Sequence, residues 1–172
     1  GQSLSDKLKR IVKLKKGASI LVHPVKNPNR FGVVTLKKNK IINLVEKPKN
    51  TKSNLAITGL YFFDNSVVRK TLNLRKSKRN ELEIIDLLKE YKKINSLKVE
   101  YLGRGAAWLD AGTIDDFNQT SIFVSSIEKR QGFKIACLEE ISLINKWIDK
   151  NKIKKAMSFY GNCEYSKYLK SL

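Results

Sequence analysis

The apolar residues near the start of the chain are spaced first as in a helix and then as in a strand. Leucine, isoleucine and valine recur at steps of four, three and one before Gly17, which predicts a helix over about residues 5–15. Gly17 stands where helices commonly end. The segment Ala18–Val25 is rich in isoleucine and valine, and Pro24 excludes a helix near its end, so a strand is expected there.

A β-hairpin and a buried strand are expected next. Gly32–Leu36 and Ile41–Val45 flank a short polar run, which is the composition of two strands joined by a tight turn. The segment Leu55–Asp64 is apolar at both alternating sets of positions and is therefore interpreted as a central strand. Its Gly59 predicts that another group approaches the backbone closely.

Helical spacing then returns. Helices are predicted over 65–74 and 81–94, followed by a strand over 97–102. The second of these helices carries a continuous apolar stripe of Ile84, Leu87, Leu88, Tyr91 and Ile94. Thr113 is expected to cap the next helix, and from residue 128 onward the pattern is helical alone. These patterns predict an α/β sheet with flanking helices and a helical C-terminal appendage.

Charge adds a question about partners. The 172 residues fit one domain, and 35 lysines and arginines against 16 acidic residues give a formal net charge of +19. A balance of this size is typical of proteins that bind nucleic acid or another anionic surface. Most of the charge is lysine spread over every segment, without an arginine-rich stripe, so a solvated basic surface is the favoured interpretation and a polyanion-binding face the alternative.

Other composition features exclude several classes of protein. Cys137 and Cys163 form no C-x-x-C pair and His23 is the single histidine, so neither a metal cluster nor a disulfide framework is expected, and the cytoplasm is the expected compartment. His23 is expected to be a packed or surface imidazole. No apolar run approaches the ~20 residues of a membrane span. The start at Gly1, without an initiator methionine, predicts a partial chain.

Three clusters combine glycine and charge at the ends of predicted strands: Arg30–Gly32, Glu46–Pro48 and Trp108–Gly112. Ligands of α/β sheets bind at such strand ends. Each cluster also has a plainer explanation, because Glu46–Pro48 is compatible with an ordinary surface turn and Asp110 is a common turn former.

Together the clusters resemble the sugar-1-phosphate nucleotidylyltransferases, and most closely the glucose-1-phosphate thymidylyltransferases. The resemblance extends over nearly the whole chain, through blocks at residues 27–34, 46–48, 56–62, 79–84, 102–113 and 128–141. It implies that residues 1–130 are the sugar-phosphate-binding part of a mixed, Rossmann-like nucleotidyltransferase sheet and that 131–172 are the helical appendage. It also implies transfer of a thymidylyl group from dTTP to glucose 1-phosphate, with Mg²⁺ and with release of pyrophosphate.

The resemblance assigns roles to particular residues. Asp110 is implied to be one of two carboxylates that hold Mg²⁺, Lys47 to neutralise the sugar phosphate, and Glu46 to accept hydrogen bonds from glucose hydroxyls. Gly32 is implied to let the backbone approach the sugar, and Ile57 to supply a backbone contact.

Further residues complete the implied site. Arg79 is expected to reach the phosphate, so Lys47 and Arg79 are the candidate catalytic residues. Tyr61 and Trp108 are expected to form walls of the pocket, or else to be core residues. By resemblance, Arg104 belongs to an effector site in a homo-oligomer.

The chain also departs from the family. Phe31, a candidate sugar contact, stands where tyrosine is usual, Asn80 where glycine is usual and Ala111 where threonine is usual. The glycine-rich G-G-x-G-T-R-L nucleotide loop of the family's N-terminal half has no counterpart in these residues, so the chain is expected to be incomplete as an enzyme by itself. A non-catalytic sugar-phosphate-binding or regulatory partner is the first alternative, and a basic nucleic-acid-binding module the second.

Overall fold

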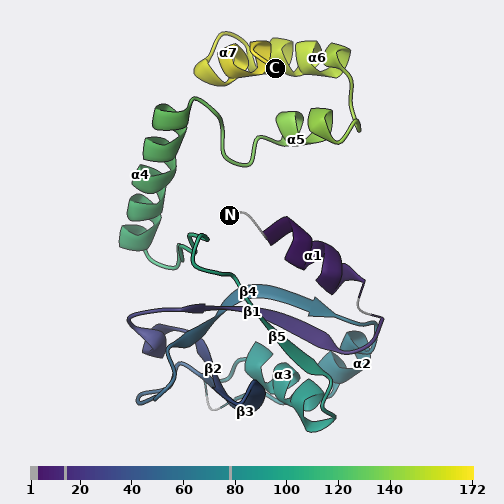
Figure 1. Cartoon of the computed structure of the whole chain (residues 1–172), viewed down its shortest axis with the longest axis vertical. Helices are drawn as coiled ribbons and strands as arrows, with labels where there is room; N and C mark the ends of the chain where they lie inside the picture. Colours follow the sequence, from purple (N-terminus) through teal and green to yellow (C-terminus); the bar gives the residue numbers. More distant parts are fainter. Residues whose placement is uncertain (1–3, 14, 78) are drawn as a thin grey trace. The chain divides into compact units, whose positions relative to one another are not determined.

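The computed structural model describes residues 4–13, 15–77 and 79–172, which divide into two compact units (Figure 1). Residues 1–108 belong to the first unit and residues 109–172 to the second. The functional division expected after residue 130 remains a prediction. In the first unit the elements are α1 (Leu4–Val12), β1 (Ala18–Pro24), η1 (Pro28–Arg30), β2 (Gly32–Lys37), β3 (Lys40–Glu46), β4 (Leu55–Phe63), α2 (Val67–Leu72), α3 (Ile84–Lys93) and β5 (Leu97–Tyr101).

The first unit is built on a five-stranded mixed sheet with the order β3-β2-β4-β1-β5. Strand β1 pairs parallel with β5 and antiparallel with β4, and the β2–β3 hairpin joins the sheet through β4. The apolar strand Leu55–Phe63 therefore lies at the centre of the sheet, as predicted. The α/β class is confirmed.

Helices cover both faces of this sheet (Figure 1). On the α3 face, Ile20 and Val22 of β1 pack with Ile85 and Leu88 of α3. On the other face, Leu21 of β1 packs in a cluster with Ile11 and Leu4 of α1, together with Phe62, Leu102 and Trp108. Successive β1 residues thus serve opposite faces, as the pleat of a strand requires.

Two details of the sequence interpretation are corrected. Ile94, placed in the apolar stripe, is 62% exposed because it lies just past the end of α3, whereas Ile85 is buried. At Gly59 (φ 81°), an added Cβ would meet no described atom within 4 Å, so no part of the described chain makes the predicted close approach at this point. The β1–β4 register shifts at this point, and glycine serves the positive φ of that irregularity.

The Asp64 carboxylate, just after β4, hydrogen-bonds to the backbone just before β1. Oδ2 of Asp64 accepts a hydrogen bond from the Gly17 amide at 2.6 Å, and Oδ1 accepts from the Ser66 amide at 3.0 Å and the Tyr91 hydroxyl at 3.1 Å. Because these donors favour the ionised form, with the Ser66 hydroxyl first among them, the pKa of Asp64 falls to about 2.

The second unit is helical. Its elements are α4 (Ile114–Gln131), α5 (Leu138–Ile144), α6 (Lys150–Tyr160) and α7 (Glu164–Lys170). Thr113 caps α4 as expected, since its hydroxyl accepts from the Asp116 amide at 3.1 Å. Cys137, Ile153 and Leu169 form the buried centre of α5–α7. None of the helices in the described part of the chain is both long and apolar enough to cross a bilayer.

Candidate functional site

The hairpin end places two of the predicted clusters side by side. Gly32 at the start of β2 lies opposite Glu46 at the end of β3. The backbone then turns at Lys47, which has φ 41° and whose amide donates to the Phe31 carbonyl at 3.0 Å. Clusters that are separate in the sequence therefore share one edge of the sheet because the hairpin register aligns them.

Gly32 is required by its surroundings. A Cβ at this position would lie 2.9 Å from Cδ1 of Ile85 and 3.1 Å from Oε2 of Glu46. Both contacts are closer than ordinary packing allows. Glycine at this position thus lets Ile85 of α3 and the Glu46 side chain pack closely against the backbone of β2.

The charges around Glu46 are mixed. Burial raises the pKa of its carboxyl group above the ordinary value, and the like charge of Glu83 raises it further. Lys47 and Arg79 oppose this effect through their positive charges. Glu46 is thus a half-buried carboxylate with cations nearby, an environment suited to accepting hydrogen bonds from a polar ligand.

Arg79 is held by carboxylates at the start of α3. Its guanidinium lies 3.0 Å from Glu81 and 3.6 Å from Glu83. Glu83 also accepts from the Ser77 hydroxyl at 2.9 Å. The side chain of Arg79 remains about half exposed, so it is oriented by these contacts but still accessible to an anion.

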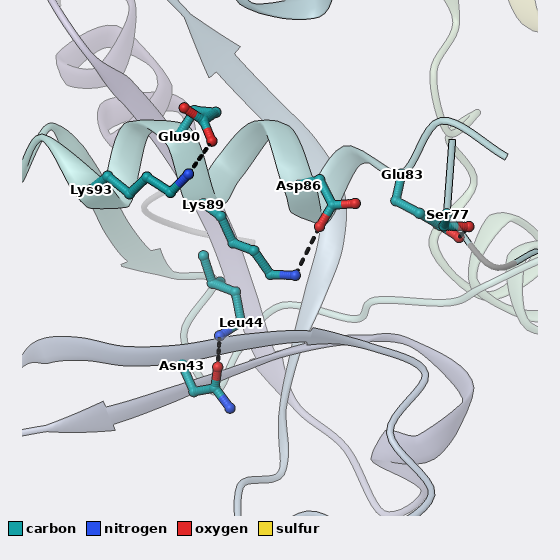
Figure 2. A network of polar contacts seen from close by, with 8 residues as sticks. All are labelled: Asn43, Leu44, Ser77, Glu83, Asp86, Lys89, Glu90 and Lys93. Carbon is teal, nitrogen blue, oxygen red and sulfur yellow. Dashed lines mark hydrogen bonds and ion pairs between the residues drawn. The ribbon is translucent and has the colours of Figure 1, made fainter. Parts of the chain in front are cut away.

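A cavity of about 530 Å³ connects these groups. Its polar lining comes from β3, the loop before α3 and the first turns of α3, and consists of Asn43, Glu46, Lys47, Ser77, Arg79, Glu83, Asp86 and Lys89. Figure 2 shows the α3 side of this region, where Lys89 points from the helix toward Leu44 of β3 and pairs with Asp86 at 2.8 Å. A pocket of this size suits a small molecule.

Two further predicted residues come from the central strand. The Val33–Ala56 pairing places Ile57 next to Gly32 in the ladder, with its side chain buried in the core at 5% exposure. Tyr61 stacks on Phe63 with ring centroids 6.2 Å apart. Burial raises the pKa of the Tyr61 hydroxyl, and the negative charge of Glu46 raises it further.

Phe31 and Trp108 form a separate aromatic group. Their rings meet edge to face at 5.0 Å, and the indole Nε1 donates to the Thr58 carbonyl at 3.2 Å. His23 joins them with its ring 6.4 Å from Trp108, and its Nδ1 is buried without a hydrogen-bond partner among the described residues. This packed imidazole agrees with the sequence expectation.

Asp110 and Arg104 lie apart from these groups in the chain. Asp110 is exposed at the start of the second unit, and its Oδ2 would be 3.0 Å from a Cβ at position 112, so Gly112 lets the carboxylate fold over the turn. Among the described residues, no three His, Cys, Asp or Glu side chains gather as a complete metal site. A single exposed carboxylate nevertheless fits Mg²⁺, which often takes one or two protein carboxylates and completes its shell with phosphate and water.

Arg104 is exposed in a glycine-flanked loop.

The sequence interpretation missed Ser77, Glu83 and Lys89. Only Glu83 had a signal, since it directly precedes the α3 helix. Its contact with Arg79 follows from i,i+4 spacing, but the approach of all three residues to Glu46 depends on how α3 packs on β3.

The fold is that of the nucleotide-transferring enzymes, and the chain belongs to the nucleotidyl transferase family, whose model matches residues 1–126. The chain is similar to the glucose-1-phosphate thymidylyltransferase of Neisseria meningitidis, with 41% identity over 170 residues. The enzyme of the same name from Mycobacterium tuberculosis is 38% identical over 173 residues.

Solved structures agree with this assignment. A Bacillus anthracis protein described as a glucose-1-phosphate thymidylyltransferase, crystallised with sucrose, matches 72% of this chain and 49% of its own, with a TM-score of 0.63 and 33% identity. A UDP-glucose pyrophosphorylase bound to UDP-glucose, at 19% identity and a TM-score of 0.61, shares the fold. The alignment with the meningococcal relative covers 98% of this chain, but this chain spans only 59% of the length of that relative.

Proposed function

We propose that this chain is the sugar-phosphate-binding part of a Mg²⁺-dependent nucleotidyltransferase that makes dTDP-glucose and pyrophosphate from dTTP and glucose 1-phosphate. The observation that carries the proposal is the cavity in which Glu46, Lys47 and Arg79 meet beside the side-chain-free Gly32. The names of the relatives supply the choice of sugar and base. Cytoplasmic location and a homo-oligomer with Arg104 at an effector site are parts of the same proposal.

In this proposal, the sugar of glucose 1-phosphate and its phosphate are bound by different groups. The Glu46 carboxylate accepts hydrogen bonds from sugar hydroxyls, and the backbone at Gly32 and Ile57 supplies contacts to the ring. The role of Tyr61 as a wall of the pocket stays a prediction, because Tyr61 is not among the residues that line this cavity. Phe31 and Trp108 do not line this cavity, and Trp108 packs in the cluster on the α1 face of the sheet, so a contact of these two rings with the sugar is not part of this proposal.

Lys47 and Arg79 act on the phosphate. Two anionic phosphates must approach one another in this reaction, and cations lower the cost of that approach. Lys47 is an exposed point charge at the turn after β3. Arg79 exchanges its contacts with Glu81 and Glu83 for the phosphate, and its fork of donors fits two oxygens of that group.

Asp110 is the residue that would hold Mg²⁺. The ion supplies charge neutralisation and alignment of the phosphates when it is bound. A phosphate monoester loses its second proton with a pKa of about 6, so the attacking oxygen is already anionic at neutral pH and needs no strong base in the protein. That oxygen forms a bond to the α-phosphorus of dTTP, and the bond from the α-phosphorus to the β-phosphate bridging oxygen breaks.

The test measures pyrophosphate release from dTTP and glucose 1-phosphate with Mg²⁺. The chain is assayed alone and mixed with the part of the meningococcal relative that the alignment leaves uncovered. Activity is expected in the mixture and is expected to fall about a hundredfold or more for Lys47→Met, since a cation aimed at transferring phosphates is worth several kcal/mol. Lys26→Met, at an exposed lysine outside the cavity, serves as the matched control.

Two results would contradict the proposal. Binding of glucose 1-phosphate by calorimetry, without pyrophosphate release in any mixture, would favour a non-catalytic sugar-phosphate-binding partner. Salt-sensitive retention on DNA, without binding of glucose 1-phosphate, would favour a nucleic-acid-binding module.

A further inference from the structure

A second concave surface lies between α2 and α3 and is strongly basic. This groove, of about 520 Å³, is lined by the exposed end of α2, the segment after it and one side of α3. Its charged residues are Arg69, Lys70, Arg75, Lys89 and Lys93, with Asp86 and Glu90 as the acidic members. The proposed sugar-phosphate pocket does not use Arg69, Lys70 or Arg75.

The acidic residues of the groove are already paired. Asp86 binds Lys89 at 2.8 Å and Glu90 binds Lys93 at 2.6 Å, as Figure 2 shows along α3. Within the described chain, no carboxylate pairs with Arg69, Lys70 or Arg75. The groove therefore gathers three positive charges that are not neutralised by the protein itself.

At least one of these cations is held in place. Nζ of Lys70 lies 5.1 Å from the centre of the Tyr91 ring, an arrangement favoured by the ring's negative face. Tyr91 is itself fully buried, and its hydroxyl donates to Asp64. Lys70 is thus oriented by a rigid residue of the core, and Asn73 places an amide in the same groove.

The charge of the whole chain is concentrated on this side of the division. Residues 1–108 contain 25 lysines and arginines against 8 acidic residues, a net charge of +17, whereas residues 109–172 contain 10 against 8, a net charge of +2. The excess positive potential favours anions near the first unit.

We propose that the α2–α3 groove is a binding site for a small ligand with several phosphate groups, of the tripolyphosphate type. Three unneutralised cations and an amide match several phosphate oxygens, and arginine binds phosphate in a bidentate manner. The volume is that of a small-molecule site rather than a track for a polymer. Inorganic tripolyphosphate and a nucleoside triphosphate share this chemistry, and nucleic acid is a different class.

Calorimetric titration of the chain with inorganic tripolyphosphate, at about 150 mM NaCl to screen unspecific attraction, tests the site. The double variant Arg69→Gln/Arg75→Gln is expected to bind about tenfold more weakly or worse, because each charge-assisted hydrogen bond contributes substantially. The control Lys26→Gln/Lys37→Gln removes the same charge at exposed positions outside the groove and is expected to bind as the unmodified chain does. A parallel titration with ATP shows which ligand the groove recognises. Stronger binding of ATP than of tripolyphosphate assigns the site to a nucleoside triphosphate. Equal binding of the two shows that only the phosphate chain is recognised.

Three outcomes would overturn the inference. Equal weakening by both double variants would show attraction by net charge only. If Lys47→Met lost tripolyphosphate binding while Arg69→Gln/Arg75→Gln kept it, the ligand would belong in the sugar-phosphate pocket instead. Binding of a single-stranded oligonucleotide without binding of tripolyphosphate would indicate a nucleic-acid surface. Because glucose 1-phosphate binding is measured separately, failure here leaves the proposed function untouched.

Discussion

At the scale of single residues, the protonation of Glu46 makes ligand binding at the proposed site depend on pH. Its carboxyl group is half-buried beside Glu83, so its pKa is raised, and Lys47 and Arg79 only partly offset the rise. The ionised form is the one that accepts hydrogen bonds from sugar hydroxyls. Protonation of Glu46 therefore removes an acceptor at a pH higher than for an ordinary glutamate.

Glucose 1-phosphate should accordingly bind more weakly as the pH falls, and the loss should begin at a higher pH than an ordinary glutamate would give. Glu46→Gln is expected to bind about tenfold more weakly at pH 7, since the loss of a charge-assisted hydrogen bond costs about 1.5–3 kcal/mol. In this variant the residual pH dependence should be that of the ligand phosphate alone. Calorimetric titrations of both proteins at several pH values check this, and an identical pH profile for the two would exclude Glu46 from the site.

Asp64 links the stability of the fold to pH, and its pKa is shifted in the opposite direction from that of Glu46. Its pKa is lowered to about 2 in the folded chain, so its stabilising contribution is fully present above the ordinary value near 3.8 and is lost as the pH falls toward 2. Asp64→Asn should lower the free energy of unfolding by about 1–2 kcal/mol at pH 7, because the donors of Gly17 and Tyr91 lose a charged acceptor. Urea unfolding between pH 2 and 7 checks this, and a difference that stays constant over that range would contradict it.

Residues next to one another in the sequence were the easiest to assign. Glu46 and Lys47 stand together at a strand end, so a local pattern was enough to mark them. Ser77 and Glu83 reach the same cavity only because α3 packs on β3, and no local pattern encodes that contact. Ile94 was wrongly assigned to the core because helical spacing continues past the residue at which α3 ends.

At the scale of elements, two glycines with positive φ differ in what surrounds them. Gly17 has φ 96°, and a Cβ there would lie 2.4 Å from the Ser96 carbonyl oxygen in the turn before β5. Gly59 has φ 81° but open space around it. The first position is restricted by both backbone and contact, and the second by backbone alone.

Gly17→Ala should therefore be the more damaging change. Gly59→Ala is expected to cost about 1–2 kcal/mol, the usual penalty for the left-handed region, and Gly17→Ala clearly more because β1 and the Ser96 turn must also separate. Thermal and urea unfolding of the two variants, measured together, give the comparison. Equal losses would mean that the Ser96 turn yields without cost.

Most elements were predictable because alternation and helical spacing are local. The strands at 18–24, 32–37, 40–46 and 55–63 each begin at the predicted residue or within one of it. The first helix ends at Val12 rather than near Lys15, and residue 14 lies outside the described residues. The order of the strands was not encoded locally, since it depends on pairings between distant segments.

At the scale of the whole molecule, the charge difference between the units predicts a difference in their response to salt. The net charge of +17 in residues 1–108 opposes compact folding through self-repulsion, whereas +2 in residues 109–172 does so only slightly. Raising NaCl from about 20 to 500 mM shortens the Debye length severalfold. Amide hydrogen exchange of the full chain should show slower exchange in β1 and β4 and little change in α6 and α7. Equal slowing in both units would instead indicate a general effect of salt.

The parallel pairing of β1 with β5 also constrains the order in which the sheet assembles. Ala18 lies opposite Leu97, so this ladder closes a loop containing the hairpin, β4, α2 and α3. Bringing such distant segments together has a large entropic cost before any contact compensates for it, whereas the β2–β3 hairpin closes over a short turn. The hairpin is thus expected to form early and β5 to dock late, which would leave the backbone edge of β1 temporarily unpaired and open to another chain during synthesis.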